Sequence, residues 1–401
     1  MRRIIIVGAS LAGLRTAQAL RAEGFGGTLT LVGAEPYPPY DRPPLSKKWL
    51  AAGADDAPAD DPALPIPAGL DAKWLLGTRA VGLDPAAGAV HLEDGGELAY
   101  DGLVIATGAA ARPLPTAGTP PPEGVFTLRD RDDADALRAE LRPGRRITVV
   151  GGGLLGSEVA ATARHRGLEV TLVVSTPHPL ERLIGEAAGR FVTALHRAAG
   201  ITVVVCRSAT GFRDSGRLAA VELSDGTEIG ADLAVLALGT RPNAEWLAAA
   251  GLVVDEGVLC DEHLRVLRAD GTPARGIVAA GDVVSRPHPL TGGTPIRLGH
   301  WNNAAEQAAA AAYNLLHPAR PRPFAGVPSF WCDLHGVTLR AVGLPAIADE
   351  VRVAENALYT RKLEITYARA GRLVGALTVG RNGRLAGHRR VLAESLMAIP
   401  A

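Results

Sequence analysis

Apolar runs alternate with segments of helical period through most of the chain. Continuous apolar runs are typical of strands buried in a parallel sheet, and they occur at Arg2–Val7, Leu29–Val32, Tyr100–Thr107, Arg146–Val150, Glu169–Val174, Ile201–Cys206, Asp232–Leu238 and Gly276–Ala280. The segments between them predict helices at Leu14–Ala22, Arg129–Leu141, Val159–Arg166, Glu186–Ala199 and Trp301–Leu316. Regular alternation of strands and helices predicts a doubly wound α/β fold.

The pattern changes after Arg320. Short strand-like pieces separated by glycine turns follow at Ser329–Cys332, Thr338–Val342, Lys362–Tyr367 and Leu373–Val379, and a helix is predicted at Arg389–Met397. This pattern indicates a small α+β domain at the end of the chain. Three further segments predict a short strand region, a hairpin and a flexible surface excursion, at Ala80–Leu92, Leu218–Glu228 and Ala51–Gly69.

A glycine fingerprint follows the strand at Arg146–Val150: Gly151-Gly-Gly153-Leu154-Leu155-Gly156. In a dinucleotide-binding unit the first glycine makes the tight turn, the second lets a pyrophosphate approach, and the third lets helix and strand pack closely. The following helix offers free N–H groups to the phosphates. The motif alone is a weak signal, but here a strand precedes it and a helix follows it.

A second unit of this kind opens the chain, with Gly8-Ala-Ser10-Leu11-Ala12-Gly13 after the first strand. Ser10 replaces the middle glycine; it is small and can donate a hydrogen bond. Glu35 follows the second strand, where a dinucleotide fold places an acid on a ribose hydroxyl. The alternative, an ordinary βαβ unit with chance glycines, is less favoured because the unit occurs twice.

Two more segments are candidates for cofactor contacts. The proline-rich stretch Pro36–Lys48 carries Arg42 and Lys47 on a stiff loop that suits phosphate or flavin contacts, although a solvated surface loop would look similar. Gly281-Asp282 ends a predicted strand. Its acid can accept a hydrogen bond from a ribityl hydroxyl, or it can cap a helix.

Composition excludes several classes of protein. A length of 401 residues allows two or three domains, and a formal net charge of zero argues against a nucleic-acid protein held by a basic field. No apolar run reaches the roughly 18 residues of a membrane span, and no signal peptide follows Met1, so we expect a cytoplasmic protein. Cys206, Cys260 and Cys332 form no CxxC pair, which argues against a disulfide framework or a zinc site, and no metal is expected.

Taken together, the motifs resemble the FAD-dependent ferredoxin reductases of oxygenase systems over nearly the whole chain. The resemblance rests on the two fingerprints and on Arg42-Pro-Pro-Leu-Ser-Lys47, Ala106-Thr107-Gly108, Leu128-Arg129, Gly239-x-Arg-Pro-Asn243, Ala280-Gly-Asp282, Trp301-x-Asn-Ala304 and Phe330-Trp331-x-Asp333. It implies an FAD-binding domain at 1–112 and 237–318, an NAD(P)-binding domain at 113–236 and a C-terminal reductase domain at 319–401.

The resemblance also implies roles for individual residues. FAD would contact Gly8, Ser10, Leu11, Ala12, Gly13, Glu35, Arg42, Lys47, Ala106, Thr107, Gly108, Arg129, Gly281, Asp282, Trp301 and Trp331. NAD(P)H would contact Gly151, Gly153, Leu154, Leu155, Gly156, Glu158, Val174, Ser175 and Gly239. Lys47 and Glu158 would form the catalytic pair beside the flavin and the nicotinamide; otherwise Glu158 is a simple helix-terminus acid.

Several positions depart from the family pattern. Ser10, Gly299, Cys332 and Leu334 replace the family's Gly, Glu, Ser and Gln. Val174 stands where NADH-selective relatives carry Glu, so we expect weak discrimination between NADH and NADPH, with Ser175, Thr176, His178 and Arg182 near the strand end. Alternatively, Val174 only extends the strand, and Glu169 or the backbone holds the ribose.

The function implied is hydride transfer from NAD(P)H to FAD and single-electron transfer to a 2Fe–2S ferredoxin, indirectly serving an oxygenase. Arg340, Arg381, Arg389 and Arg390 are candidate docking residues or simply a solvated face. No nucleic-acid or membrane partner is expected, and the protein would be a monomer or weak dimer. Two alternatives stay open: a flavin NAD(P)H oxidase or disulfide reductase, for which no cysteine precedes Cys206, and an apoptosis-inducing-factor-like redox flavoprotein.

Overall fold

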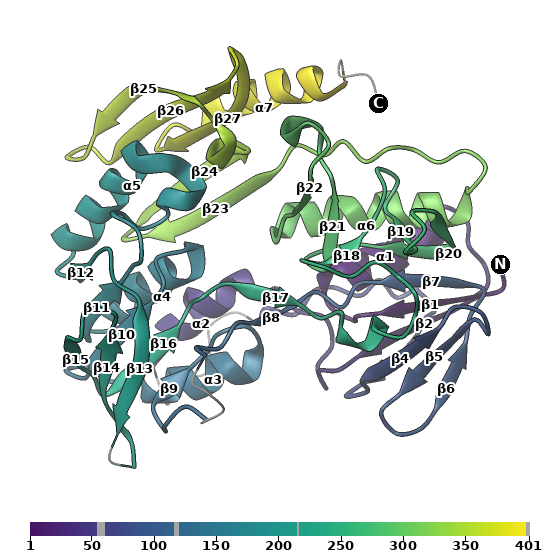
Figure 1. Cartoon of the computed structure of the whole chain (residues 1–401), viewed down its shortest axis with the longest axis horizontal. Helices are drawn as coiled ribbons and strands as arrows, with labels where there is room; N and C mark the ends of the chain where they lie inside the picture. The colour runs from purple at the N-terminus through teal and green to yellow at the C-terminus, as the bar shows by residue number, and fades with distance from the viewer. Residues whose placement is uncertain (54–60, 116–119, 215, 398–401) are drawn as a thin grey trace.

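The computed structural model describes residues 1–53, 61–115, 120–214 and 216–397. Figure 1 shows two α/β units side by side, with a smaller C-terminal unit packed above the second of them. The predicted α/β class, with two doubly wound units and an appended α+β unit, is confirmed. Within the described residues, no helix combines the length and apolarity that crossing a membrane requires.

The first sheet has the strand order β19-β20-β7-β1-β2-β3. Its strands are β1 (Arg3–Val7), β2 (Thr28–Gly33), β3 (Lys73–Leu76), β7 (Gly102–Ile105), β19 (Arg265–Leu267) and β20 (Pro273–Ala279). All pair in parallel except β19, which is an antiparallel edge strand. Helices α1 (Leu11–Ala22) and α6 (Trp301–Leu316) pack against each other in this unit. The sheet thus combines β1, β2, β3 and β7 with the much later strands β19 and β20, and buried side chains of both groups share one core.

The second sheet is entirely parallel, in the order β12-β11-β10-β16-β9. Its strands are β9 (Val125–Phe126), β10 (Arg146–Val150), β11 (Glu169–Val173), β12 (Thr202–Val204) and β16 (Leu233–Leu236). The helices of this unit are α3 (Arg131–Glu140), α4 (Leu154–His165) and α5 (Glu181–Ala198).

Three of these helices begin earlier than the sequence pattern predicted. Helix α1 begins at Leu11 and α4 at Leu154, because the last residues of each fingerprint already belong to the first helical turn. Helix α5 extends back to Glu181, but Gly185 breaks it with a φ of 75° just before the predicted start.

Smaller strand groups surround these sheets. They are β4 (Ala80–Asp84), β5 (Ala89–Leu92) and β6 (Glu97–Ala99); β13 (Ala209–Asp214), β14 (Leu218–Leu223) and β15 (Glu228–Gly230); and β18 (Val258–Leu259), β21 (Val284–Pro287) and β22 (Pro295–Arg297). The predicted hairpin thus has a third strand, β13. Strands β8 (Ala109–Ala111) and β17 (Thr240–Pro242) pair where the chain passes between the two large units.

The C-terminal unit is a five-stranded antiparallel sheet in the order β23-β24-β27-β26-β25, with α7 (Asn382–Met397) against it. Its strands are β23 (Ser329–Leu334), β24 (Val337–Gly343), β25 (Glu350–Ala357), β26 (Lys362–Arg369) and β27 (Arg372–Val379). The sequence did not predict β25, because this edge strand is exposed on both faces and lacks the apolar alternation of a half-buried strand.

Short helical turns complete the described chain: η1 (Pro43–Ser46), α2 (Lys48–Ala51), η2 (Glu245–Leu247), η3 (Pro289–Thr291) and η4 (Pro345–Ile347). Residues 54–60 of the predicted flexible excursion lie outside the described residues. The part that follows them is anchored rather than loose, because the Asp41 N–H donates to the Pro62 carbonyl at 2.8 Å and Leu64 is buried.

Candidate active site

The predicted cofactor residues of the first unit lie at one edge of its sheet. Strands β1, β2, β7 and β20 run in parallel, so their carboxyl ends share that edge. The segments that leave it are Gly8–Gly13, Glu35, Ala106–Gly108 and Gly281–Asp282. Ligands of open α/β sheets bind outside the carboxyl ends of the strands. The structure therefore brings together groups that are spread over most of the chain.

Glycine is required at two positions of the first fingerprint. A Cβ on Gly8, whose φ is +117°, would lie 2.0 Å from the carbonyl oxygen of Ala106. A Cβ on Gly13 would lie 1.8 Å from the carbonyl oxygen of Gly8. These contacts let strand, loop and helix approach closely. Ser10 is the N-cap of α1, but its hydroxyl makes no hydrogen bond to the N–H groups of the first helical turn.

The second fingerprint has the same construction. Cβ atoms on Gly151 and Gly156 would lie 2.3 Å and 1.9 Å from the carbonyl oxygens of Ala237 and Gly151. Gly153 is the N-cap of α4, as Ser10 is of α1, and the position of its missing Cβ is open space. Leu154 and Leu155 form the first turn of α4, whose N–H groups suit a phosphate. The predicted Gly239 also has open space beside it.

A charged network joins the proline-rich loop to the first sheet. Arg42 forms an ion pair with Glu35, which also accepts a hydrogen bond from the Tyr40 hydroxyl. The other end of the Arg42 guanidinium donates to the carbonyl of Arg129 at 2.8 Å. Arg129 in turn forms an ion pair of 2.8 Å with Asp282. Four predicted cofactor residues from different segments are thus connected.

The backbone at Gly281 and Thr107 is held by side chains from neighbouring segments. The Gly281 N–H donates to the Gln307 side chain at 2.8 Å, and a Cβ on Gly281 would lie 3.0 Å from that of Ala12. The Thr107 hydroxyl donates to the carbonyl of Asn243 at 2.6 Å, and the Asn243 amide donates back to Thr107 at 2.9 Å. These two hydrogen bonds join the Ala106-Thr-Gly108 motif to the Arg241-Pro-Asn243 motif.

Lys47 and Glu158, which were predicted to be a catalytic pair, form an ion pair. Lys47 Nζ lies 2.8 Å from Glu158 Oε2, and the Glu158 side chain is only 7% exposed. The same oxygen accepts a hydrogen bond of 2.6 Å from the Ser46 hydroxyl, while Oε1 accepts one of 3.1 Å from the Asp333 backbone N–H. The Asp333 carboxylate lies 3.8 Å from Lys47 Nζ. Each of the three units therefore contributes to one ion-pair cluster.

This cluster corrects the alternative interpretation of Glu158 as a helix-terminus acid. Because α4 begins at Leu154, Glu158 lies in its second turn and points into the junction of the three units. Its buried carboxylate is compensated by an ammonium group and by two hydrogen-bond donors. Isolated buried charges are costly, so an arrangement of this kind requires all its partners.

A cleft of about 480 Å³ opens beside Lys47. Both predicted tryptophans, Trp301 and Trp331, line it, and the Trp301 indole N–H donates to the Asp41 carboxylate at 2.7 Å. Its other lining residues come from the proline-rich loop, α2, α6 and the segment after residue 60: Pro43, Pro44, Lys48, Trp49, Asp61, Pro62, Ala63 and Asn302. A concave site that combines aromatic and proline rings with charged and polar side chains suits a planar ligand that also makes polar contacts.

Sequence reasoning missed Ser46, Asp41 and Asp333 as site residues. Asp333 had a signal, since it stands two positions after Trp331 on β23 and therefore on the same face of the strand. The contacts of Ser46 and Asp41 depend on segments more than a hundred residues away, and no local pattern indicates them.

Comparison with known proteins agrees with this geometry. The model of the pyridine nucleotide-disulphide oxidoreductase family matches residues 2–308, and a reductase C-terminal domain matches residues 329–401. The ferredoxin reductase component of chlorobenzene dioxygenase from Cupriavidus sp. (strain PS12) is 37% identical over 350 residues, covering 85% of this chain and 80% of the relative.

Rhodocoxin reductase from Rhodococcus erythropolis is 35% identical over 404 residues, covering 99% of this chain and 91% of the relative. The solved covalent putidaredoxin reductase–putidaredoxin complex has a TM-score of 0.89 at 33% identity and covers 98% of this chain and 93% of that chain. The chain belongs to the pyridine nucleotide-disulphide oxidoreductase family.

Because the chain belongs to this oxidoreductase family, its cofactors are FAD and NAD(P)H, and the residues present fit them. The two glycine cradles admit backbone-close ligands at two helix N-termini. Arg129 Nε and His300 Nδ1 are buried near Asp282 and have no hydrogen-bond partner within the described residues. The sixteen-residue helix that follows His300 begins with the cleft residue Trp301.

In this oxidoreductase, the departures from the family pattern on β23 fall on the core face of the strand. Cys332 and Leu334 are 0% and 1% exposed, whereas Trp331 and Asp333 alternate with them and face the site. Gly299 lies beside Asp282, because a Cβ there would be 3.6 Å from the Asp282 carboxyl carbon. Substitutions on the core face leave the site-facing residues in place.

No cysteine precedes Cys206 in the sequence, but the fold brings Cys332 close to the Lys47–Glu158 pair. Its thiol packs against α4 close to Glu158, with Sγ 3.7 Å from the Leu154 carbonyl. Burial and the neighbouring Glu158 carboxylate raise the pKa of this thiol well above its ordinary value. A protonated, enclosed thiol is a poor nucleophile, so Cys332 does not support a disulfide reductase.

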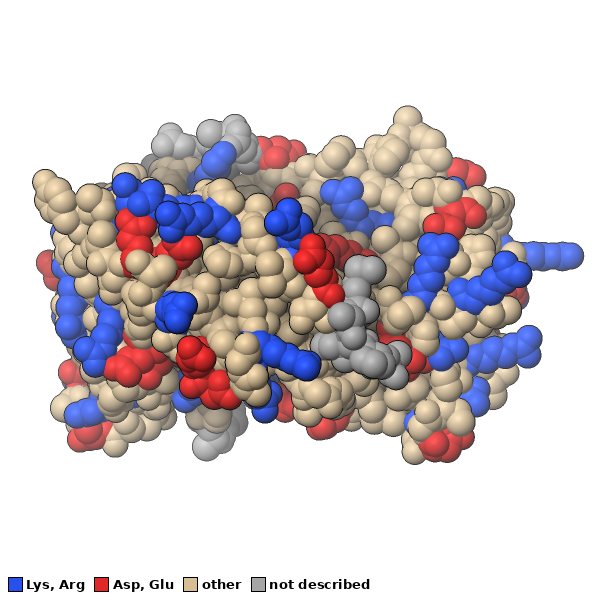
Figure 2. Space-filling view, turned by 90° about the horizontal axis from the view of Figure 1, so that it is seen from above, with Lys and Arg blue, Asp and Glu red and all other residues tan. Residues whose placement is uncertain are grey.

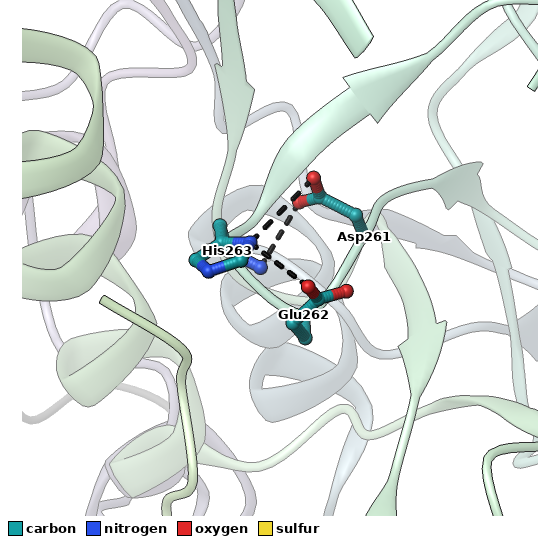
Figure 3. Close-up of side chains that lie close together, drawn as sticks. All are labelled: Asp261, Glu262 and His263. Atoms are coloured by element: carbon teal, nitrogen blue, oxygen red, sulfur yellow. Dashed lines mark hydrogen bonds and ion pairs between the residues drawn. The ribbon is translucent and has the colours of Figure 1, made fainter. Parts of the chain in front are cut away.

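Asp261, Glu262 and His263 also lie close together, as Figure 3 shows. Asp261 accepts hydrogen bonds from the backbone N–H groups of His263 and Arg265, and from the Arg265 side chain at 2.7 Å. His263 Nδ1 lies 3.1 Å from Glu262. These bonds stabilise the turn before β19, and we do not propose a metal centre there.

Proposed function

We propose that the chain is an FAD-dependent NAD(P)H:ferredoxin reductase that delivers electrons to a 2Fe–2S ferredoxin serving an oxygenase. The observation that carries the proposal is the ion-pair cluster of Lys47, Glu158 and Asp333, which lies where the two nucleotide-binding edges and the C-terminal sheet meet. Relatives whose names describe ferredoxin reductase components of dioxygenases support it. A cytoplasmic location is part of the proposal and agrees with three free cysteine thiols.

The predicted residues are assigned two binding roles. The first cradle, with Glu35, Arg42, Arg129 and Asp282, holds FAD, and the second cradle holds NAD(P)H. FAD supplies the hydride-accepting and single-electron chemistry when it is bound. The protein's contribution is to orient the two nucleotides and to exclude water with the indole rings of Trp301 and Trp331.

Lys47 and Glu158 position one another in the proposed reaction. A partly buried ammonium group next to a carboxylate presents a fixed positive end toward the cleft, where it stabilises negative charge that develops on a bound ring system. Ser46 and Asp333 hold the carboxylate from two further directions. The cluster keeps its geometry only when all three units are docked.

The test starts from the purified protein and its flavin content. We expect a yellow protein that FAD saturates, whose flavin absorbance bleaches with NADH or NADPH under anaerobic conditions, and that reduces cytochrome c only when a 2Fe–2S ferredoxin is added. A folded protein that gains no flavin absorbance with FAD would refute the proposal. Ferredoxin-independent consumption of O₂ at the same rate would instead favour a flavin oxidase.

A matched glycine pair tests the first cradle. Gly13→Ala places a Cβ against the Gly8 carbonyl and is expected to remove most bound FAD from the protein that still folds. Gly26→Ala is the control, because its Cβ would meet nothing within 4 Å. Equal flavin content in the two variants, measured by absorbance ratio after gel filtration, would contradict this assignment.

A further inference from the structure

The end of β11 lacks the carboxylate that would discriminate between the two nicotinamide nucleotides. Val174 follows β11 and is 1% exposed. Its Cγ1 lies 2.1 Å from where a Cβ on Gly152 would be, so the side chain packs directly beneath the glycine loop. A carboxylate at this position accepts hydrogen bonds from ribose hydroxyls and repels a 2′-phosphate. Val174 does neither.

Hydrogen bonds fix the conformation of the loop after Val174. The Leu180 N–H donates to the Gly152 carbonyl at 2.7 Å, and Leu180 has a left-handed φ of 62°. The Thr176 hydroxyl donates to the His178 carbonyl at 2.7 Å, and the His178 N–H donates to the Glu181 carboxylate at 2.9 Å. The chain therefore folds back over the fingerprint before α5 continues, and the Glu181 carboxylate is occupied within the loop.

This fold brings Arg182 to the strand end. Its guanidinium lies 3.4 Å from the Ser175 hydroxyl, and both residues are exposed. Within the described residues, Arg182 forms no ion pair. The other arginine beside this strand end, Arg207, is engaged by Asp225. His178 is also engaged, since its Nδ1 lies 3.0 Å from the Thr193 hydroxyl.

We propose that Ser175 and Arg182 bind the 2′-phosphate of NADPH, so that the protein uses NADPH at least as efficiently as NADH. The inference rests on the proposed function and specifies its electron donor. A guanidinium with free N–H groups and an adjacent hydroxyl are the donors that a phosphate dianion requires. They lie one residue beyond the strand end, next to the glycine loop that holds the rest of the dinucleotide.

The first experiment measures binding without turnover. Adenosine 2′,5′-bisphosphate and AMP are titrated calorimetrically into the FAD-loaded protein. We expect the wild type to bind the bisphosphate more tightly than AMP. Arg182→Ala should lower the affinity for the bisphosphate by about tenfold or more and leave the affinity for AMP unchanged. Arg182→Lys should restore part of the affinity. Arg190→Ala is the control, because Arg190 lies on the same helix but is paired with Glu186.

The second experiment measures the ratio of kcat/KM for NADPH to that for NADH. We expect a wild-type ratio of one or more, a fall of about tenfold in Arg182→Ala, and a smaller fall in Ser175→Ala. Val174→Glu should invert the ratio in favour of NADH. Because Val174 is buried and that variant can fail to fold, Ser175→Asp at the exposed neighbouring position makes the same electrostatic test.

Three results overturn the inference. The first is a wild-type ratio of kcat/KM for NADPH to that for NADH that is clearly below one. The others are equal bisphosphate affinity in Arg182→Ala and Arg190→Ala, and an unchanged nucleotide ratio in Ser175→Asp. Reduction of the flavin by NADH alone refutes only this inference. Failure of both nucleotides to reduce it refutes the proposed function itself.

Discussion

At the scale of single residues, Glu158 depends on the rest of the site more than any other predicted residue. Its two oxygens accept from Ser46, Lys47 and the Asp333 backbone, so the position of the carboxylate is set from three directions. The Lys47 side chain is 19% exposed, which places this ion pair at the boundary between the core and the cleft. Removal of Lys47 leaves the mostly buried Glu158 carboxylate without its ion-pair partner, whereas removal of Glu158 leaves Lys47 with its longer ion-pair contact of 3.8 Å to Asp333.

We predict that Glu158→Gln slows anaerobic flavin reduction by NAD(P)H about tenfold to a hundredfold, because Lys47 loses its partner and shifts from its working position. Stopped-flow absorbance at the flavin band measures the rate, and FAD content should stay near that of the wild type. The control is Glu169→Gln, at the opposite end of the neighbouring strand. The double variant Lys47→Gln/Glu158→Gln should cost less than the sum of the two single changes; strictly additive losses would show that the two residues act independently.

At the scale of elements, helix α5 connects the second unit to the C-terminal sheet. The Tyr367 hydroxyl on β26 donates to the Ile184 carbonyl at 2.7 Å, next to the break at Gly185. Further along α5, the fully buried His196 lies with its Nδ1 2.9 Å from Nε2 of His335, in the turn between β23 and β24. Burial, with His335 as a second cause, lowers the pKa of His196 to about 3.

This histidine pair predicts a specific loss of stability in acid. Above pH 6.5 His196 is neutral in both states and contributes no pH dependence. Between pH 6.5 and about 3 the unfolded chain takes up a proton that the folded chain does not, so the free energy of unfolding falls by up to about 1.4 kcal/mol per pH unit from this group. His196→Gln cannot titrate and should flatten that slope.

Urea unfolding at several pH values between 7 and 4.5 measures the slope. The matched control is His165→Gln on the exposed end of α4, which should retain the wild-type pH dependence. His288 stays in both variants; since burial lowers its pKa to about 4, it preserves part of the acid sensitivity. Identical slopes in wild type and His196→Gln would show that the His196–His335 contact does not control acid stability.

At the scale of the whole molecule, the C-terminal sheet leads from the cleft to the surface. Its register aligns Trp331 with Arg340, Thr378, Glu364 and Glu355 across the five strands. Figure 2 views the molecule from above and shows basic and acidic side chains interspersed over the visible surface rather than one broad basic patch. A ferredoxin that docks there must be recognised by individual unpaired cations.

Ion pairs narrow the set of docking candidates among the predicted arginines. Arg381 is paired with Glu355 and Arg389 with Glu306, while Arg390 lies 3.9 Å from Glu394. Arg340 is exposed and, within the described part of the chain, has no carboxylate partner. It also neighbours Trp331 on the adjacent strand, at the wall of the cleft.

We therefore predict that Arg340→Glu lowers kcat/KM for ferredoxin reduction about tenfold at low salt, because it replaces an attractive charge by a repulsive one facing an acidic partner. The difference from wild type should shrink as salt screens the interaction, and flavin reduction by NAD(P)H should not change. Arg369→Glu, at the far end of β26, is the control. Equal effects of the two substitutions, or a salt-independent loss, would argue against docking at Arg340.

The sequence by itself determined the repeated βαβ units, because apolar runs and glycine turns are local properties of the chain. It also predicted Lys47, Trp301 and Trp331, which line one cleft, and Glu158, which is paired with Lys47. It misplaced the starts of α1 and α4, since a fingerprint does not reveal where helical hydrogen bonding begins. It missed the exposed edge strand β25 for lack of a buried face.

Only the tertiary structure decided which charges neutralise one another. Lys47 and Glu158 are separated by 111 residues, and Asp333 and Ser46 join them from two other segments. The same holds for the arginines: packing pairs Arg381 and Arg389 with carboxylates, and it leaves Arg182 and Arg340 without them in the described chain. Ion pairing depends on distances of a few ångströms and on burial, and both are set when the units dock rather than by any local pattern.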